Sequence, residues 1–195
     1  SMTISAANCL ISNLLFSAAF ADITRILNVT AADAVVHQCE FVESGANLNW
    51  VDVIDASGGD NTADGLTVIG CRAYGVDAAC DSFIEITGDL DRLYVEGNHV
   101  VHDNANATAF IECATSKDLT NAYVVGNHYD SLKTSGDILI DNDTTANSGV
   151  VKGNSASHAD TMGEVLVDAD GVALIENYST GVITASGYLL PAADS

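Results

Sequence analysis

Short stretches in which apolar and polar residues alternate recur along the whole chain, separated by Gly, Asp, Asn, Ser and Thr. The clearest stretch, residues 93–99, returns almost unchanged as residues 122–128. Each unit has an apolar residue three positions before a recurring Asn or Cys, and a small or apolar residue two positions earlier still. This alternation predicts a strand with one buried face. The recurring position is occupied in turn by Asn13, Cys39, Cys71, Asn98, Asn127, Asn154 and Asn177.

Two further inward-facing segments belong to each unit. One is an alternating stretch such as Ile84-Glu85-Ile86 or Ile111-Glu112-Cys113, and the other lies two residues after the recurring Asn or Cys, for example at Val100 and Tyr129. Each unit therefore holds three short strands joined by turns. Units of this length without a helical period predict an all-β solenoid of about seven coils, in which each strand stacks on its counterpart one turn away.

The recurring Asn has a physical role in such a coil. At a tight inward bend its side-chain amide can bond the amide one turn away and the backbone groups that the bend leaves unpaired. We therefore expect an asparagine ladder that Cys39 and Cys71 interrupt. These two residues occupy neighbouring turns, so both a disulfide and two packed thiols are compatible with the pattern.

At the phrases Val95-Glu96-Gly97-Asn98 and Val124-Val125-Gly126-Asn127, the chain resembles the right-handed parallel β-helix family, which includes pectate lyases and phage tailspikes. The resemblance covers essentially the whole chain and implies a right-handed parallel β-helix with an Asn/Cys ladder. It carries little information on activity, because the family contains lyases, hydrolases and inert structural rods alike.

Length and charge narrow the function classes. We expect Ser1 and Met2 to be a cloning remnant, followed by a single domain over residues 3–195 that is part of a longer protein. The formal net charge of −21 repels nucleic acid and anionic membranes, so neither is an expected partner. Residues 9–21 lack the basic leader of a signal peptide, and no stretch has the length of a membrane span.

Carboxylates form the first candidate site. In our alignment the outward residues of the alternating stretch on successive turns are Asn28, Asp52, Glu85 and Glu112. Acids stacked about 4.8 Å apart suit the acid and nucleophile of a glycoside hydrolase, but they equally describe a solvated acidic face, which we favour. The resemblance to pectate lyases implies an arginine base, and the alignment puts no arginine beside this stack.

Paired rings form the second candidate site. His99 and His128 should face outward on adjacent turns, as should Tyr94 and Tyr123, whose rings suit stacking on sugars. Two imidazoles do not complete a typical metal site, so we expect neither a metal nor another cofactor.

An outward apolar stripe is expected at Phe83, Phe110, Leu139 and Leu166. Such a stripe predicts a covered surface, either a subunit interface or one under a loop. The resemblance to tailspikes implies a homotrimer.

The acidic, lysine-poor repeats and the Ala-Ala-Asp-Ser ending resemble uncharacterised β-helical proteins of marine tailed phages. This resemblance implies a virion structural protein without catalytic activity, such as a tailspike, fibre or decoration protein, that binds a receptor or glycan on the host surface. The alternative is a carbohydrate-active depolymerase, a glycoside hydrolase or polysaccharide lyase, that uses Asp52, Glu85 and Glu112. A third possibility is a bacterial cell-surface adhesin, for which the same fold, charge and surface residues are expected.

Overall fold

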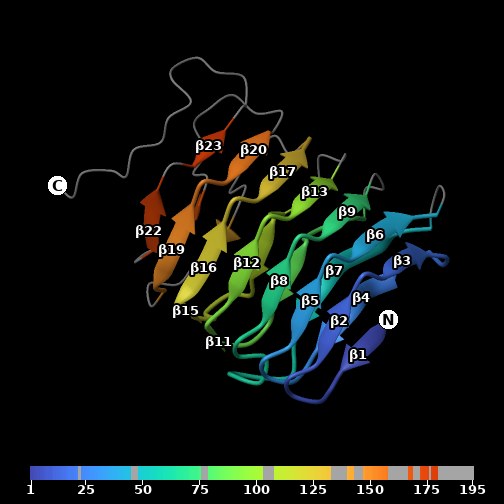
Figure 1. Ribbon diagram of the computed structural model, residues 1–195, viewed down its shortest axis with the longest axis horizontal. Coiled ribbons are helices and arrows are strands. Elements are labelled where there is room, and N and C mark those ends of the chain that lie inside the picture. Colours follow the sequence, from blue (N-terminus) through green and yellow to red (C-terminus); the bar gives the residue numbers. More distant parts are fainter. Residues whose placement is uncertain are drawn as a thin grey trace.

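The chain winds into a parallel β-solenoid in the computed structural model, with each turn adding one strand to each of three sheets (Figure 1). The structure describes residues 1–21, 23–44, 48–75, 79–102, 108–132, 140–142, 147–157, 167–168, 172–175 and 177–179. Every strand pairing among them is parallel, and these residues contain no helix. The predicted all-β solenoid class is confirmed.

Three seven-stranded sheets, called A, B and C here, run the length of the solenoid. Sheet A consists of β1 (Met2–Ile4), β4 (Ile23–Val29), β7 (Trp50–Ala56), β10 (Ile84–Ile86), β14 (Ile111–Cys113), β18 (Ile140–Asp141) and β21 (Val167–Asp168). Sheet B consists of β2 (Leu10–Ser12), β5 (Val35–His37), β8 (Thr67–Ile69), β12 (Tyr94–Glu96), β16 (Ala122–Val125), β19 (Gly149–Lys152) and β22 (Val172–Ile175). Sheet C consists of β3 (Leu15–Ala18), β6 (Glu40–Glu43), β9 (Arg72–Gly75), β13 (His99–His102), β17 (His128–Ser131), β20 (Ser155–Ser157) and β23 (Tyr178–Ser179). A short extra sheet pairs β11 (Leu90–Asp91) with β15 (Leu119–Thr120).

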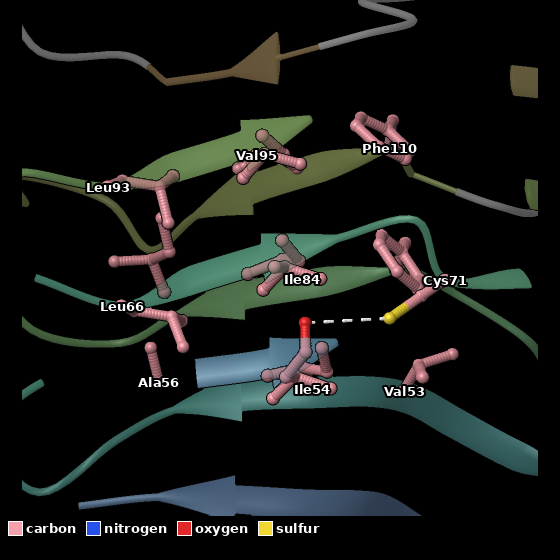
Figure 2. Close-up of a cluster of buried hydrophobic side chains, with 14 of the residues drawn as sticks. Val53, Ile54, Ala56, Leu66, Cys71, Ile84, Leu93, Val95 and Phe110 are labelled. Carbon is pink, nitrogen blue, oxygen red and sulfur yellow. Dashed lines mark hydrogen bonds between the residues drawn. The ribbon is translucent and has the colours of Figure 1, made fainter. Parts of the chain in front are cut away.

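The core is a continuous column of apolar side chains between the sheets. Figure 2 shows part of this column, with Ile54 and Ile84 of sheet A, Val95 of sheet B, and Leu66 and Leu93 among its side chains. All five are at most 1% exposed. Full burial of one such side chain contributes about 1.5–3 kcal/mol, so repetition along the axis supplies the stability that no single turn has.

The predicted asparagine ladder is present along the bend between sheets B and C. The Nδ2 of Asn98 donates to Asn127 Oδ1 at 2.9 Å, the Nδ2 of Asn127 donates to Asn154 Oδ1 at 2.9 Å, and the Nδ2 of Asn154 donates to Asn177 Oδ1 at 2.9 Å. Each amide also donates to a backbone carbonyl, as Asn127 does to Val95 O at 3.0 Å. Because all four amides are nearly fully buried, these bonds satisfy groups that water cannot reach.

Cys39 and Cys71 occupy the ladder position in the preceding turns as free thiols. The Cys71 backbone N–H donates to Asn98 Oδ1 at 2.8 Å, and its Sγ lies 3.7 Å from Val36 O. Burial raises the pKa of the Cys71 thiol to about 11. The interpretation of these cysteines as packed thiols is therefore confirmed.

In the first turn the predicted alignment is off by one residue. The register pairs Ser12 with His37 and Phe16 with Phe41, so Leu14, and not Asn13, corresponds to Cys39. Asn13 has a φ of 56°, matching the glycine conformation that precedes the ladder in later turns, such as Gly97 with a φ of 63°. Asn tolerates this left-handed conformation, and that tolerance explains its presence at the turn.

The predicted apolar stripe is wrong for Phe83 and Phe110, because both side chains are 0% exposed. The chain bends at each Phe immediately before the sheet A strand, so the Phe and the following Ile both point into the core. Their rings stack on each other with centroids 5.3 Å apart, and Figure 2 shows Phe110 among the core side chains. Leu139 and Leu166 lie outside the described residues.

The described residues include no helix that is long and apolar enough to cross a membrane.

Candidate functional site

The acidic row on the outer face of sheet A differs from the predicted one at a single position. The register pairs Asn28 with Asp55, Asp55 with Glu85, and Glu85 with Glu112. Asp52 is therefore not in the row and instead pairs with Arg25. Both aspartates of β7 have apolar neighbours. Val53 and Ile54 are both buried, so the alternation shifts between the two aspartates and Asp55 is the equivalent of Glu85.

Asp52 and Glu85 nevertheless form one hydrogen-bonded carboxyl pair. Asp52 is 5% exposed and accepts a bond from Ser82 Oγ at 2.7 Å. Burial raises the pKa of Glu85 to about 8, and the negative charges of Asp52 and Asp55 and a hydrogen bond with Asp52 add to this shift. Burial also raises the pKa of Asp52, although its bonds to Ser82 oppose the shift. Near neutral pH, the Asp52 and Glu85 pair therefore holds a proton.

Asp55 is the most enclosed member of the row, with 1% of the residue exposed. Its Oδ2 forms an ion pair with Arg25 Nη1, contrary to our expectation that no arginine lies beside the acids. The same Arg25 nitrogen donates to Ser57 Oγ at 3.2 Å, and Ser57 donates to Asn28 Oδ1 at 2.5 Å. Burial raises the pKa of Asp55, and the Arg25 charge only partly offsets that shift.

This geometry does not match a glycosidase pair. The two carboxyl groups of a retaining enzyme stand about 5 Å apart with the scissile bond between them. Asp52 and Glu85 bond to each other directly, and Asp52 and Asp55 are closed to a substrate by burial. Arg25, the basic residue beside the row, is engaged by Asp55.

On the outer face of sheet C, His99 and His128 lie opposite each other in register. Their ring centroids are 4.9 Å apart, and their side chains are 51% and 45% exposed, so the expected outward pair is present. The structure adds Asp130, two residues after His128 on the same face of β17. Its Oδ2 lies 3.1 Å from His128 Nε2 and 3.6 Å from His99 Nε2.

Two serines of β20 support this cluster from the next turn. Ser157 Oγ donates to Asp130 Oδ1 at 2.5 Å, and Ser155 Oγ lies 2.6 Å from His128 Nδ1. Burial raises the pKa of Asp130, but the Ser157 bond and the neighbouring histidines outweigh burial and hold that pKa below its usual value. Asp130 is therefore a carboxylate at neutral pH.

A shallow hollow of about 220 Å³ adjoins His99 on the same face. Its polar rim consists of Glu40, Arg72 and His99, which are register partners on β6, β9 and β13. Tyr74, which is 50% exposed, provides an aromatic wall. Sequence reasoning did not select Tyr74, although it stands two residues after Arg72 and thus on the same face of the strand.

Tyr94 and Tyr123 lie on the outer face of sheet B, in register on β12 and β16. Their rings are stacked with centroids 5.2 Å apart, and the hydroxyl of Tyr94 donates to Glu96 Oε2 at 2.8 Å. The predicted alignment of the two tyrosines on adjacent turns is present, and in addition their rings stack on each other. They belong to a different face from the histidines, so the four ligand-binding candidates do not form one site.

Comparison with known proteins found no matching family model, no matching curated protein and no matching solved structure. The likeness to pectate lyases and tailspikes thus extends to the parallel β-solenoid arrangement alone.

Proposed function

We propose that this chain is a non-catalytic structural segment of a phage virion, of the tailspike, fibre or decoration type, that binds a host-surface glycan through the outer face of sheet C. The observation that carries the binding part is the hollow beside Tyr74, with Arg72, Glu40 and His99 at its rim. The virion part rests on the resemblance of the repeats to β-helical phage proteins.

The chemistry of the hollow suits a sugar. An exposed aromatic ring offers a flat apolar face to a pyranose, and charged side chains at its edge offer hydrogen bonds to hydroxyl groups. A solenoid holds these groups on paired strands, so they are ordered before a ligand arrives and little conformational entropy is lost on binding.

The binding proposal is tested on a glycan array and by calorimetry with the best oligosaccharide. Tyr74→Ala is expected to weaken binding by about tenfold, the loss of one stacking contact of about 1.5 kcal/mol. Tyr123→Ala is the matched control, because it removes an exposed tyrosine from another sheet. Loss of binding in Tyr123→Ala but not in Tyr74→Ala would overturn the hollow as the site and favour the Tyr94 and Tyr123 pair.

The second candidate function is a depolymerase. The carboxyl geometry does not match a glycosidase pair, but the pKa of Glu85, about 8, is in the range that a general acid needs. Its test is reducing-end release from bacterial and algal polysaccharides, with Glu85→Gln as the variant and Asp60→Asn, at an exposed acidic residue outside the row and the hollow, as the control. We expect no release by the wild type. Release that Glu85→Gln abolishes and Asp60→Asn retains would replace the non-catalytic proposal.

The assembly part of the proposal is a homotrimer in the particle, as the tailspike resemblance implies. Light scattering gives the mass in solution, and mass spectrometry of the phage particles whose genome carries this sequence is expected to find the chain. A monomeric mass in solution would contradict the proposed homotrimer. Phage particles that lack the chain would contradict the proposal that it is a virion protein.

A further inference from the structure

The cluster of His99, His128 and Asp130 has the spacing of a metal site. One ligand atom from each residue lies within 4.8 Å of the others, and the Asp130 Oδ2 is 3.1 Å and 3.6 Å from the two Nε2 atoms. Two ligand atoms that each stand about 2.1 Å from a tetrahedral zinc ion are about 3.4 Å apart. The three side chains therefore already stand near the separation that coordination needs.

The next turn of the solenoid orients two of these ligands. Ser157 occupies Oδ1 of Asp130 and so leaves Oδ2 to face the histidines. Ser155 contacts Nδ1 of His128, and a hydroxyl there can accept the Nδ1–H of a metal-bound imidazole. Such outer contacts to ligating histidines and carboxylates are a regular feature of metal sites.

From this geometry we propose that His99, His128 and Asp130 bind one zinc-like divalent transition-metal ion, with solvent completing the coordination. Two imidazoles and a carboxylate favour zinc and its neighbours in the transition series over magnesium or calcium, which prefer oxygen ligands alone. All three side chains are partly exposed, so the ion has an open path from solvent and a free coordination position. The inference does not rest on glycan binding, although His99 also lines the hollow beside Tyr74.

The repeat explains how such a site can arise without a dedicated loop. β13 and β17 are parallel and in register, so a histidine at the same place in each strand produces a stacked pair. The alternation of the strand then places Asp130 on the same face as His128. Three ligands thus come from two rigid strands, and metal binding needs no backbone rearrangement.

The test is calorimetric titration of Zn²⁺ into the chelator-treated, dialysed wild-type chain, with excess Mg²⁺ present to saturate the acidic surface. One equivalent of Zn²⁺ is expected to bind. His99→Ala and Asp130→Ala are expected to abolish this stoichiometric step, and Ser157→Ala to weaken it about tenfold by releasing Asp130. His37→Ala, on β5 of sheet B, is the matched control and should bind as the wild type does.

A second readout separates the site from diffuse binding to acids. In ¹⁵N spectra of the imidazole nitrogens, one equivalent of Zn²⁺ should shift the signals of His99 and His128 and leave that of His37 in place. His99 is half exposed, so its truncation leaves the core intact and the variant remains a fair test. Absence of a one-equivalent step, or a step that His99→Ala retains, would overturn the proposal.

Discussion

The asparagine ladder and the acidic row of sheet A both place like side chains on neighbouring turns, with opposite electrostatic results. In the ladder, Asn127 Oδ1 accepts from Asn98 Nδ2 while Asn127 Nδ2 donates to Asn154 Oδ1, and each amide is fully used. In the acidic row, Glu85 lies between Asp55 and Glu112, and carboxylates offer only acceptors once they are ionised. Burial and this repulsion raise the pKa of Glu85, so that a proton remains on the Asp52 and Glu85 pair near neutral pH.

The difference shows which residues a parallel solenoid can repeat inside its wall. A side chain that both donates and accepts is complementary to its own copy, so repetition stabilises the ladder. An acid repels its own copy, so the row requires compensation, here an Arg25 ion pair to Asp55 and a shared proton between Asp52 and Glu85. The ladder therefore contributes to stability, and the acidic row lowers it as the pH rises.

The largest effect in this comparison is expected from Asn127→Ala. The substitution removes the acceptor of two Asn98 N–H groups and the donor to Val95 O. Because these groups are buried, we expect a loss of about 4 kcal/mol in the free energy of unfolding. Urea denaturation followed by the fluorescence of the single tryptophan, the buried Trp50, measures it.

Lys152→Ala is the control for that experiment, since Lys152 is an exposed residue of β19 and its loss should change stability by less than about 0.5 kcal/mol. Equal effects of the two substitutions would contradict the view that the ladder bonds stabilise the fold.

A smaller, pH-dependent effect is expected from Glu85→Gln. The folded-state pKa of Glu85, about 8, lies above its ordinary value of 4.5, so the stability associated with its proton is complete below pH 4.5. That stability is lost as the pH rises through 8. Glu85→Gln should match the wild type near pH 5 and exceed it by about 2 kcal/mol above pH 8, a figure that allows for solvent screening of a partly exposed group.

Thermal or urea unfolding measured at intervals from pH 5 to 9 would trace this divergence. Glu40→Gln, at an exposed position of β6, is the control and should run parallel to the wild type. Parallel profiles for wild type and Glu85→Gln would show that the acidic row does not hold a proton at Glu85.

Alternation along the strands was sufficient to predict the class of fold and most of the core. Val36, Val68, Val95, Val124 and Val151 are all buried as expected, and the ladder asparagines bond as their repetition indicated. The incorrectly predicted side-chain orientations occur where the alternation of buried and exposed residues is interrupted. At the bends before β10 and β14 two successive residues face inward, so Phe83 and Phe110 were placed on the wrong side.

The candidate sites were harder to predict, because they depend on register between turns. A shift of three residues within β7 exchanged Asp52 for Asp55 in the acidic row, and nothing local distinguishes the two aspartates. The outward orientation of Asp130 and Tyr74 could have been predicted from the sequence. Asp130 stands two residues after His128 on β17, Tyr74 stands two residues after Arg72 on β9, and residues two apart in a strand lie on the same face. Their proximity to His99 depends on the register between β13 and its neighbours β9 and β17. That register is found by aligning the repeats and cannot be inferred from a single strand.

The smallest effect is expected from Cys71→Asn, which would extend the ladder by one asparagine. This substitution tests most directly whether an asparagine side chain is complementary to its own copy on the next turn. An asparagine there would donate to Asn98 Oδ1 and to Val36 O, where the thiol now makes a contact of 3.7 Å. Replacement of that weak contact by amide hydrogen bonds should raise the free energy of unfolding by about 1 kcal/mol. Urea denaturation of Cys71→Asn beside Cys71→Ala separates the gained bonds from the loss of sulfur packing. If both variants lose stability equally, the packing of the Cys71 side chain is its main contribution to stability. An additional ladder amide would then be favourable only where the backbone groups already lie at hydrogen-bonding distance.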